Sequence, residues 1–579
     1  MKILVICSLV ALSVRASPAT LVVATLFGAW AFLRRDDRSV AARTLLVGTL
    51  VPLCGGFPDL VAGLVFLALL CLDGRNTRDR SIQWASPFLI LTGAWAVTRF
   101  AMEFDIAPFV YLVSGRDGPG PAGISNLIRW LRGGGPGYFV AIEDFIRITL
   151  MVSLWASLEA ERGKTFCKGL IVGATLCAFF AIVEGVAPGT VELLRNPSPF
   201  WKSINRMASF ATDPNALGIL AGVLIPLAFV TCGSWALPIV TTLLVGGLYS
   251  GSRSFFLIPI VTGMYVVWRA KGLRFACVTG GTVVGLTAML VASSSVLPHP
   301  PAGLVRLRES LDPSRFSTTI ESRSIFTKLS WHAFEDYPVF GLGLGRFDDY
   351  VVPYSHELNL GIGVWRDGAT SVYLEVLCEL GLLGALVFAL TALGLRPLPS
   401  NSLVYKGVGV AFLMILTIGA HTNVPEGVAV AGLLLAQTVE ARRVVSRRVL
   451  LLSLCGAAAI PLVYQSRAIY GFYPWEQTGA EFVRWTASES RGAVMCSHPT
   501  ELRLRNETPY VQDIEVRLST GTQLRTLQQG ENLSLSVPCH EGIASYMLNV
   551  SPGFTPSKFG FQGDERLLGV RQLSNLPTP

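Results

Sequence analysis

Three arginines lie in short polar stretches beside long apolar runs. Arg206 is in "NRMASFATDPNALG", Arg253 in "LYSGSRSFF" and Arg323 in "ESRSIFTKLSWHAFED". The planar guanidinium group donates two hydrogen bonds at once and stays charged, which suits it to bind phosphate. A charge at the edge of an apolar span is costly and usually functional. The alternative for each arginine is an ordinary role, in which the side chain reaches lipid headgroups or caps a helix.

A second group of charged residues begins the stretch "GVWRDGATSVYLEVLCELGLLGALVF" at 363–388. Asp367 and Glu375 are carboxylates that could orient a hydroxyl group or accept its proton. The alternatives are structural. Glu375 and Glu379 could simply begin a helix, where the macrodipole favours acidic side chains. Asp367 could be a turn residue or the ion-pair partner of Arg366.

The composition of the chain indicates whether these residues belong to a membrane protein or to a soluble one. The 579 residues are 51% hydrophobic and 15% charged, and the mean hydropathy is +0.51. Soluble proteins average about 25% charged residues, so the composition predicts a polytopic membrane protein and excludes an ordinary soluble enzyme. No phosphate-binding loop, nucleophile elbow or zinc motif is present, and "GLGLG" at 341–345 lacks the flanking strand and helix of a dinucleotide loop. The sequence indicates neither a metal nor a cofactor, and His356 is most simply a surface histidine.

Apolar runs long enough to cross a bilayer recur along residues 1–470. They predict an all-α polytopic membrane bundle of about 13–15 transmembrane helices. The runs lie at 3–14, 16–33, 42–72 (two short spans), 85–103, 137–156, 168–188, 216–232, 235–250, 254–268, 276–296, 376–396, 405–420, 425–440 and 449–465.

Lys and Arg gather in alternate loops, and such loops are retained on the cytoplasmic side. The basic loops lie near 34–43, 75–80, 162–168, 269–274, 396–406 and 442–448. The other loops are then predicted to face outward: 104–136, 189–215, 250–253, the long loop 297–375, 421–426 and everything after 466. The net charge of +8 is explained by this topology and does not indicate a nucleic-acid partner.

The last part of the chain differs from the rest. From 471 to 579 the hydropathy falls and alternating stretches appear, such as "LRLR", "DIEVRL" and "YMLNV". We therefore divide the chain into a membrane helical domain, 1–470, and an extracytoplasmic domain resembling a β-sandwich, 471–579. Cys496 and Cys539 are the cysteines of this exported domain, and such a pair predicts a disulfide. Two buried free thiols are the alternative.

Four stretches together resemble the O-antigen ligase and polymerase superfamily of bacterial envelope glycan enzymes. They are "SFATDPNALGILAGVLIPLAF" (209–229), "YSGSRSFFL" (249–257), "SRSIFTKLSWHAFEDYPVFGLGLGRF" (322–347) and "YLEVLCELGLLG" (373–384). Each motif alone is weak, but their order, spacing and outward placement agree with the family. The stretch 471–486 is also similar to the start of the β domain attached to some polymerase-like members.

The resemblance implies glycosyl transfer outside the cytoplasmic membrane. A glycan on a polyprenyl diphosphate is attacked by a hydroxyl group of an acceptor glycan, without a nucleotide sugar or a metal. Arginines matching Arg253 and Arg323 are implied to hold the diphosphate. With Asp367 and Glu375 these are our candidate catalytic residues. The candidates for substrate contact are Arg206, Asn215, Arg346, Arg366, Thr370 and Tyr373.

The chain departs from the ligase pattern at one place. Ligases of this family usually carry His-Asn before the "YLE" motif, and this chain has Thr370-Ser371. The departure favours a polymerase over a ligase that moves a finished glycan onto lipid A core or protein. A transporter or flippase is a further alternative, supported by Glu143, Asp144 and Arg147 within one span but not by inverted repeats or broken helices. The expected location is the bacterial inner membrane, and the expected partners are membrane lipid and chain-length regulators or export proteins.

Overall fold

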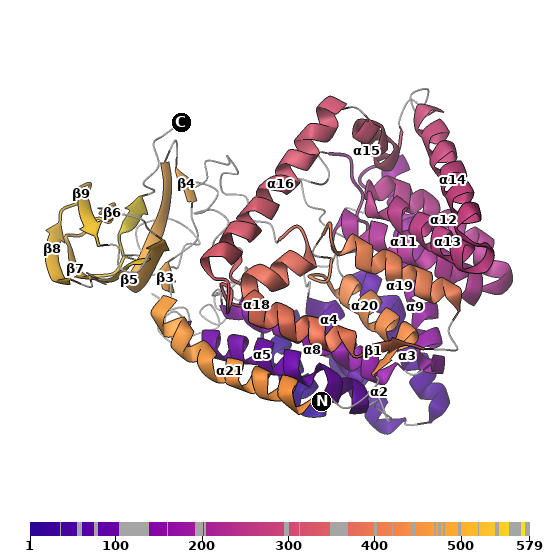
Figure 1. Cartoon of the computed structure of the whole chain (residues 1–579), viewed down its shortest axis with the longest axis horizontal. Helices are drawn as coiled ribbons and strands as arrows, with labels where there is room; N and C mark the ends of the chain where they lie inside the picture. Colours follow the sequence, from indigo (N-terminus) through magenta and orange to yellow (C-terminus); the bar gives the residue numbers. More distant parts are fainter. Residues whose placement is uncertain are drawn as a thin grey trace.

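The computed structural model of the chain is drawn in Figure 1. It describes residues 1–34, 36–54, 61–73, 79–103, 138–158, 160–190, 201, 204–293, 300–311, 313–347, 369–398, 402–419, 421–441, 446–467, 470–472, 476–478, 481–495, 499–518, 520–538, 543–554 and 569–573. The predictions for His356, Arg366, Asp367, Cys496 and Cys539 concern residues outside these ranges.

The apolar runs form helices. As far as residue 467 the elements are helices, apart from the short paired strands β1 and β2. In chain order they are α1 (Lys2–Ser13), α2 (Pro18–Leu33), α3 (Asp37–Cys54), α4 (Val61–Leu72), α5 (Asp79–Glu103), α8 (Tyr138–Ser157), α9 (Ala160–Val186), α11 (Pro214–Thr231), η2 (Gly233–Trp235), α12 (Ala236–Ser250), α13 (Ser254–Lys271), α14 (Leu273–Ser293), α15 (Ala302–Leu311), α16 (Pro313–Asp336), α18 (Val372–Leu393), β1 (Leu395–Pro397), α19 (Leu403–Ile415), α20 (Pro425–Thr438), β2 (Val439–Ala441) and α21 (Arg447–Arg467). Every predicted span coincides with a helix, and 42–72 separates into α3 and α4. The all-α bundle is confirmed.

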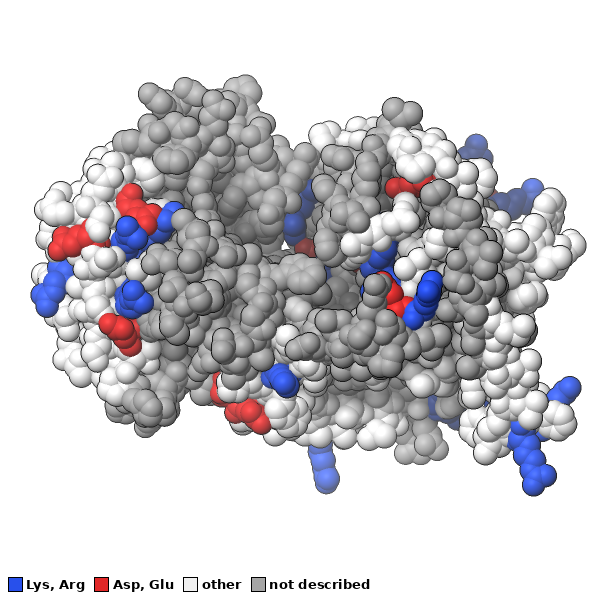
Figure 2. Space-filling view, turned by 90° about the horizontal axis from the view of Figure 1, so that it is seen from above, with Lys and Arg blue, Asp and Glu red and all other residues white. Residues whose placement is uncertain are grey.

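Several helices have the length and surface of membrane spans. In the described part of the chain, four stretches are long and apolar enough to cross a bilayer: Glu161–Val186, Pro214–Thr231, Gly233–Ser250 and Val372–Leu393. Large apolar side chains are also exposed around the bundle, among them Phe32, Leu33, Trp235 and Leu237. Figure 2 shows one face of the molecule, on which the described Lys, Arg, Asp and Glu side chains lie in small separate areas. The exposed apolar side chains around the helices are suited to contact with lipid.

Close contact between α3 and α9 depends on small residues. Gly169 and Gly173 are four residues apart on α9, so they lie on one face of that helix. A Cβ atom at Gly169 would lie 2.9 Å from the Cα atom of Gly48 on α3. Glycines at this spacing let two helix backbones touch, which is a common way for helices to pack in membranes.

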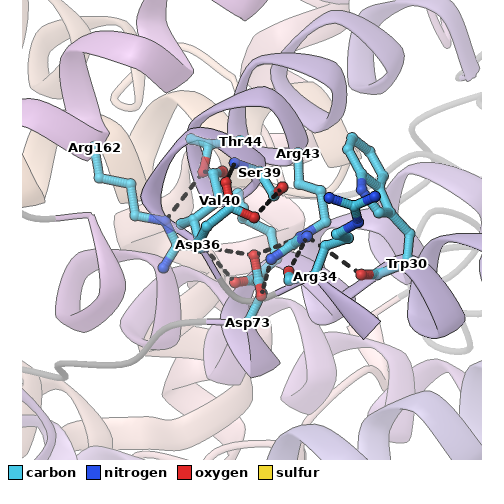
Figure 3. A network of polar contacts seen from close by, with 10 residues as sticks. Trp30, Arg34, Asp36, Ser39, Val40, Arg43, Thr44, Asp73 and Arg162 are labelled. Carbon is cyan, nitrogen blue, oxygen red and sulfur yellow. Dashed lines mark hydrogen bonds and ion pairs between the residues drawn. The ribbon is translucent and has the colours of Figure 1, made fainter. Parts of the chain in front are cut away.

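An ion pair buried at one end of these helices joins α3 to α4. Arg43 is 0% exposed and binds Asp73 through two hydrogen bonds, Nε to Oδ2 at 3.0 Å and Nη2 to Oδ1 at 2.9 Å. Its Nη1 donates to the carbonyl oxygen of Arg34, and its guanidinium lies 5.3 Å from the ring centroid of Trp30. Arg162 of α9 approaches Asp73 from the other side (Figure 3). The sequence assigned Arg43 to a basic loop, and this was wrong, because Asp73 draws the side chain inside the bundle.

The helix α18 is broken, which the sequence did not predict. Gly381 has φ 64° and ψ −165° inside it. In a regular helix the N–H groups of Leu382 and Leu383 would donate to the carbonyl groups of Cys378 and Glu379. Here they donate to the carbonyl groups of 338 and 339, at 2.7 and 3.1 Å, while the N–H groups of 342 and 343 serve Cys378 and Glu379, each at 2.8 Å. The stretch 338–343 is thus inserted into the helix.

The glycine-rich stretch 341–345 completes this insertion. Gly341 and Gly381 lie face to face, and a Cβ atom on either would collide with the backbone of the other segment. The Glu379 carboxylate accepts hydrogen bonds from the N–H groups of Gly345 at 2.9 Å and Phe347 at 3.0 Å. Arg99 of α5 donates to the carbonyl groups of Leu344 and Gly345. The glycines therefore permit a close backbone contact, and Glu379 has a structural role.

Strands follow α21. They are β3 (Tyr470–Phe472), β4 (Glu476–Thr478), β5 (Glu481–Met495), β6 (Thr500–Arg505), β7 (Gln512–Leu518), β8 (Gly521–Leu527), β9 (Asn532–Val537), β10 (Ile543–Ser551) and β11 (Arg571–Leu573). The order in the sheet is β8-β7-β10-β5-β11-β6-β9. The long strand β5 pairs with β11 through 483–485 and with β10 through 489–495, so it belongs to both halves.

The two halves of this sheet share one core. Leu502 and Leu504 of β6 pack with Ile514 and Val516 of β7 and with Leu548 of β10 in a single cluster. These side chains alternate with more exposed ones along β6 and β7, as the sequence pattern predicts for strands with one buried face. The β-rich C-terminal region is confirmed, and it has the layered form of a sandwich in which β5 crosses between the layers.

Candidate functional site

The turn between α12 and α13 collects several arginines. Arg206 donates from Nε to the carbonyl oxygen of Ser250 at 2.9 Å, and Arg306 of α15 donates from Nη1 to the carbonyl oxygen of Gly251 at 3.3 Å. Arg253 follows in the same turn, directly before α13. Gly251 has φ 65°, and a Cβ atom there would lie 3.3 Å from Arg206 Nε and 3.2 Å from Ala302 of α15. Glycine at 251 thus permits both the turn and the approach of α15.

Arg206 is held on three sides. Besides Ser250, its Nη2 donates to Oδ1 of Asn215 at 2.7 Å, and its guanidinium lies 4.9 Å from the ring centroid of Trp201. Asn215 follows Asp213, the N-cap of α11, whose carboxylate accepts from the N–H group of Ala216 at 2.6 Å. The predicted candidates Arg206 and Asn215 are therefore in contact, and Asn215 orients the arginine.

Four arginines lie close enough to repel one another electrostatically. We call them the arginine cluster: Arg206, Arg253, Arg306 and Arg323. Burial, followed by the charges of Arg306 and Arg253, lowers the pKa of Arg206 to about 9, although Asp213 opposes the shift. Burial, then Arg306 and Arg323, lowers the pKa of Arg253. Burial is also the main cause of the lowered pKa of Arg306.

Glu309 is the acid that offsets part of this charge at Arg253 and Arg306. Cations gathered in one place repel one another, and an anion bound among them would offset that repulsion. Guanidinium groups are well suited to bind a phosphate in such a site. The arrangement therefore favours a ligand with more than one negative charge.

Arg323 reaches the cluster from α16. Its Nη1 donates to the carbonyl oxygen of Ile418, at 2.6 Å, in the segment between α19 and α20. One turn further along α16, the hydroxyl group of Thr327 is 3.0 Å from that of Thr370. The apolar side of α16, including Phe326 and Leu329, packs in a cluster with Cys378 of α18. The apolar side of this helix therefore meets protein.

The segment 416–424 joins the separate parts of the site. The N–H group of Val372 donates to the carbonyl oxygen of Leu416 at 3.0 Å. Asn423 donates from Nδ2 to Oε1 of Glu375 at 3.2 Å. Just beyond, Glu426 of α20 accepts hydrogen bonds from the N–H and hydroxyl groups of Thr212, which precedes the helix bearing Asn215. The outward turn at 421–426 predicted from the loops therefore lies where both halves of the site meet.

The start of α18 holds two of the predicted candidates. Ser371 is its N-cap and accepts a hydrogen bond from the N–H group of Tyr373. The hydroxyl group of Tyr373 donates to the carbonyl oxygen of Leu413 of α19 at 3.1 Å. Glu375 lies in the first turn, which agrees with the helix-start alternative and leaves a catalytic role open. Arg346 is 3% exposed and follows the inserted stretch, where its N–H group donates to the carbonyl oxygen of Gly343 at 3.2 Å.

The charged residues within α8 pair with one another. Arg147 binds Oε1 of Glu143 and Oδ1 of Asp144, each at 2.7 Å, and Arg15 binds Oε2 of Glu143 at 2.6 Å. This network joins α8 to the linker between α1 and α2, and it neutralises charge within the bundle. The break in α18 is a feature expected of transporters, but here backbone from the same chain fills it.

Two residues near the site were missed in the sequence. Arg306 lies in the stretch "GLVRLRES", which has mixed polarity. Its only signal in the sequence is that Arg306 and Arg308 are two residues apart, so a short amphipathic helix would place them on different faces. His421 stands in a short turn between two spans, and only the outward placement of that turn could have drawn attention to it. Both become notable through contacts between segments far apart in the sequence.

The exposed apolar helices and the glycine-mediated helix packing indicate a multi-pass membrane protein, and its arginine cluster is suited to bind an anion. Residues 238–389 match the family model described as O-antigen ligase, Wzy_C. This segment holds Arg253, Arg306 and Arg323 and ends within α18. Over these residues the chain is similar to the O-antigen ligase family, in agreement with the resemblance of its motifs, and this similarity favours a membrane glycosyltransferase-like enzyme. A comparison with curated proteins gave no match.

Proposed function

We propose that the chain is a glycan polymerase. It transfers oligosaccharide repeat units from a polyprenyl diphosphate onto a hydroxyl group of an acceptor glycan, at the outer face of the cytoplasmic membrane and without a metal. The observation that carries this proposal is the arginine cluster, in which four cations from separate segments gather around one turn. A diphosphate, with more than one negative charge, is a ligand that several guanidinium groups can bind together.

The cluster would also serve the reaction itself. As the bond between the anomeric carbon and the phosphate oxygen breaks, negative charge grows on the leaving diphosphate. Guanidinium groups that are already in place stabilise this charge most in the transition state, which is how a binding site accelerates a reaction. Arg253 and Arg323 are the proposed diphosphate ligands, with Arg206 and Arg306 completing the cluster.

Asp367 and Glu375 stay proposals as the groups that orient the acceptor. Glu375 is engaged by Asn423, from the segment that also receives Arg323, which supports its presence at the site. Thr370 directly precedes the N-cap of the same helix, and Tyr373 lies in its first turn. Arg346 and Arg366 remain proposed substrate contacts, as does membrane lipid around the bundle. Proteins that regulate chain length or export the product are proposed partners.

Transfer of a finished glycan by a ligase is the second candidate, because the matching family model is described as O-antigen ligase. The polymerase is preferred because Thr370-Ser371 replaces the ligases' His-Asn. The glycans of a deletion strain distinguish the two. Loss of a polymerase should leave single repeat units attached to the final acceptor, whereas loss of a ligase should leave chains of normal length on the polyprenyl carrier. Unchanged glycans of both kinds would contradict the proposal.

We expect the strands after α21 to lie outside the cytoplasm. The basis is the alternation of basic loops, which places everything after 466 on the outer side. A reporter that is active only in the cytoplasm should therefore be inactive when fused after Pro579, and the same reporter inserted in the basic loop near 271 should be active. An active fusion at Pro579 would reverse the proposed orientation. Mass mapping without reduction should find Cys496 bonded to Cys539.

A further inference from the structure

We propose that His421 accepts the proton of the attacking hydroxyl group, a role that rests on the proposed glycan transfer. The resemblance implies a histidine at the position of Thr370, where this chain has none. His421 belongs to the turn between α19 and α20, and the structure brings that turn to the start of α18, which Thr370 precedes.

Contacts on both sides of His421 fix the turn against the site. Three residues before it, the carbonyl oxygen of Ile418 accepts from Arg323 at 2.6 Å. Two residues after it, Asn423 donates to Glu375 at 3.2 Å. His421 is therefore held between a proposed diphosphate ligand and the helix start that carries the "YLE" motif.

Glycines make room for the imidazole ring. A Cβ atom at Gly419 would collide with the ring of His421, and a Cβ atom at Gly427 would collide with its backbone carbonyl group. The Nε2 atom is buried and has no hydrogen-bond partner among the residues that the structure describes. An unpartnered buried nitrogen is destabilising, so a ligand hydroxyl group that satisfies it would be favoured there.

Electrostatics keeps this ring in the form that can accept a proton. Burial, followed by the charge of Arg323, lowers the pKa of His421 to about 4, so the imidazole is neutral near pH 7. The acids on neighbouring helices are engaged elsewhere, Glu375 by Asn423 and Glu426 by Thr212. A diphosphate bound at Arg323 would offset the arginine charge and raise the pKa of His421. Donor binding would therefore make the base stronger.

The proposed step balances as follows. The acceptor oxygen forms a bond to the anomeric carbon while the bond from that carbon to the phosphate oxygen breaks. The leaving polyprenyl diphosphate takes the electron pair, and the arginine cluster stabilises its charge. The proton of the acceptor hydroxyl group passes to His421, and it leaves to solvent after the product departs.

The test compares purified full-length variants in transfer from a polyprenyl-diphosphate-linked oligosaccharide. His421→Gln should lower kcat by about 10²-fold or more, the usual contribution of a general base, with little change in donor KM. His332→Gln is the matched control, because that histidine lies on α16, about a third exposed, with Glu335 at 3.8 Å. It should keep normal activity. Added imidazole should restore part of the activity of His421→Ala.

The pH profile separates proton transfer from a structural role. In the unmodified protein, activity should fall as the pH drops through the pKa of His421, because only the neutral ring accepts a proton. This fall should occur at higher pH in kcat than in kcat/KM, since donor binding raises the pKa. It should disappear in His421→Gln.

Two results would overturn the inference. One is normal kcat in His421→Gln, and the other is a loss that appears only in donor KM or in donor binding measured with the same polyprenyl diphosphate. If Asp367→Asn removes the acidic fall and His421→Gln does not, the aspartate is the proton acceptor. Absence of any transfer by the unmodified protein would instead count against the proposed function.

Discussion

Arg253→Lys and Arg323→Lys should each lower glycan transfer by about 10²-fold or more, with the amount of folded protein unchanged. Lysine keeps the positive charge but loses the planar fork that donates two hydrogen bonds to one phosphate. If these arginines bind the leaving diphosphate, even this mild change removes a preorganised contact from the transition state. If the two arginines contributed only their positive charge, replacement by lysine would change the rate of transfer little.

The surroundings of the two arginines sharpen this expectation. Arg253 is about half buried at a turn whose preceding carbonyl groups already serve Arg206 and Arg306. Arg323 is exposed and uses Nη1 to hold the segment 416–424. Replacement of Arg323 should therefore disturb both the diphosphate contact and the position of that segment, and its effect should equal or exceed that of Arg253.

Arg308→Lys is the control for these substitutions. Arg308 lies on α15 two residues from Arg306, but its side chain is exposed. Transfer should stay near normal in this variant. Initial rates with a lipid-linked donor would measure all three, and size-exclusion chromatography in detergent would verify folding. Near-normal rates in both Arg253→Lys and Arg323→Lys would show that these side chains only contact lipid headgroups.

Arg43→Ala should lower the free energy of unfolding by about 3–5 kcal/mol, the range found when one partner of a buried ion pair is removed. Asp73 would lose both hydrogen bonds from Arg43, and among the residues that the structure describes Arg162, at 3.9 Å, would be its remaining ion-pair contact. The carbonyl group of Arg34 would also lose a donor. These losses fall where α2, α3, α4 and α9 converge.

Thermal unfolding in detergent would measure this loss of stability, and an ion pair on the surface serves as the control. Arg396 binds Glu440 at 2.6 Å, but both side chains are substantially exposed. Exposed pairs contribute about 0–1 kcal/mol, so Arg396→Ala should change the unfolding temperature little. The double variant Arg43→Met with Asp73→Leu should recover part of the loss, since it leaves no buried charge unpaired. Equal effects of Arg43→Ala and Arg396→Ala would contradict the structural role.

Except for α15 and α16, the helices could be predicted from the sequence because they coincide with apolar runs, whose length is set by the bilayer. The strands β6, β7 and β10 could be predicted because one face of each is buried, which imposes a period of two. Arg206, Arg253 and Arg323 could be chosen because a charge beside an apolar span stands out. Each of these signals is local.

The remaining features depend on contacts between distant segments. The apolar pattern of α18 continues through Gly381, so the break became visible only with 338–343 in place. Arg306 joins the cluster because α15 approaches Gly251, and His421 joins the site because Arg323 holds the segment before it. The choice between Asp367 and His421 as proton acceptor could not be made from spacing, because the two lie on different loops.

The inserted stretch in α18 has a consequence for how the chain enters the membrane. Without residues 338–343, the carbonyl groups of Cys378 and Glu379 and the N–H groups of 382 and 383 would lose the partners that they have in the finished structure. In lipid each unsatisfied backbone group costs several kcal/mol. Residues 338–343 leave the ribosome before α18, so the template for the break is already made when the helix emerges. Biogenesis of this helix is therefore a joint insertion of two segments, and the order of synthesis supplies them in the required sequence.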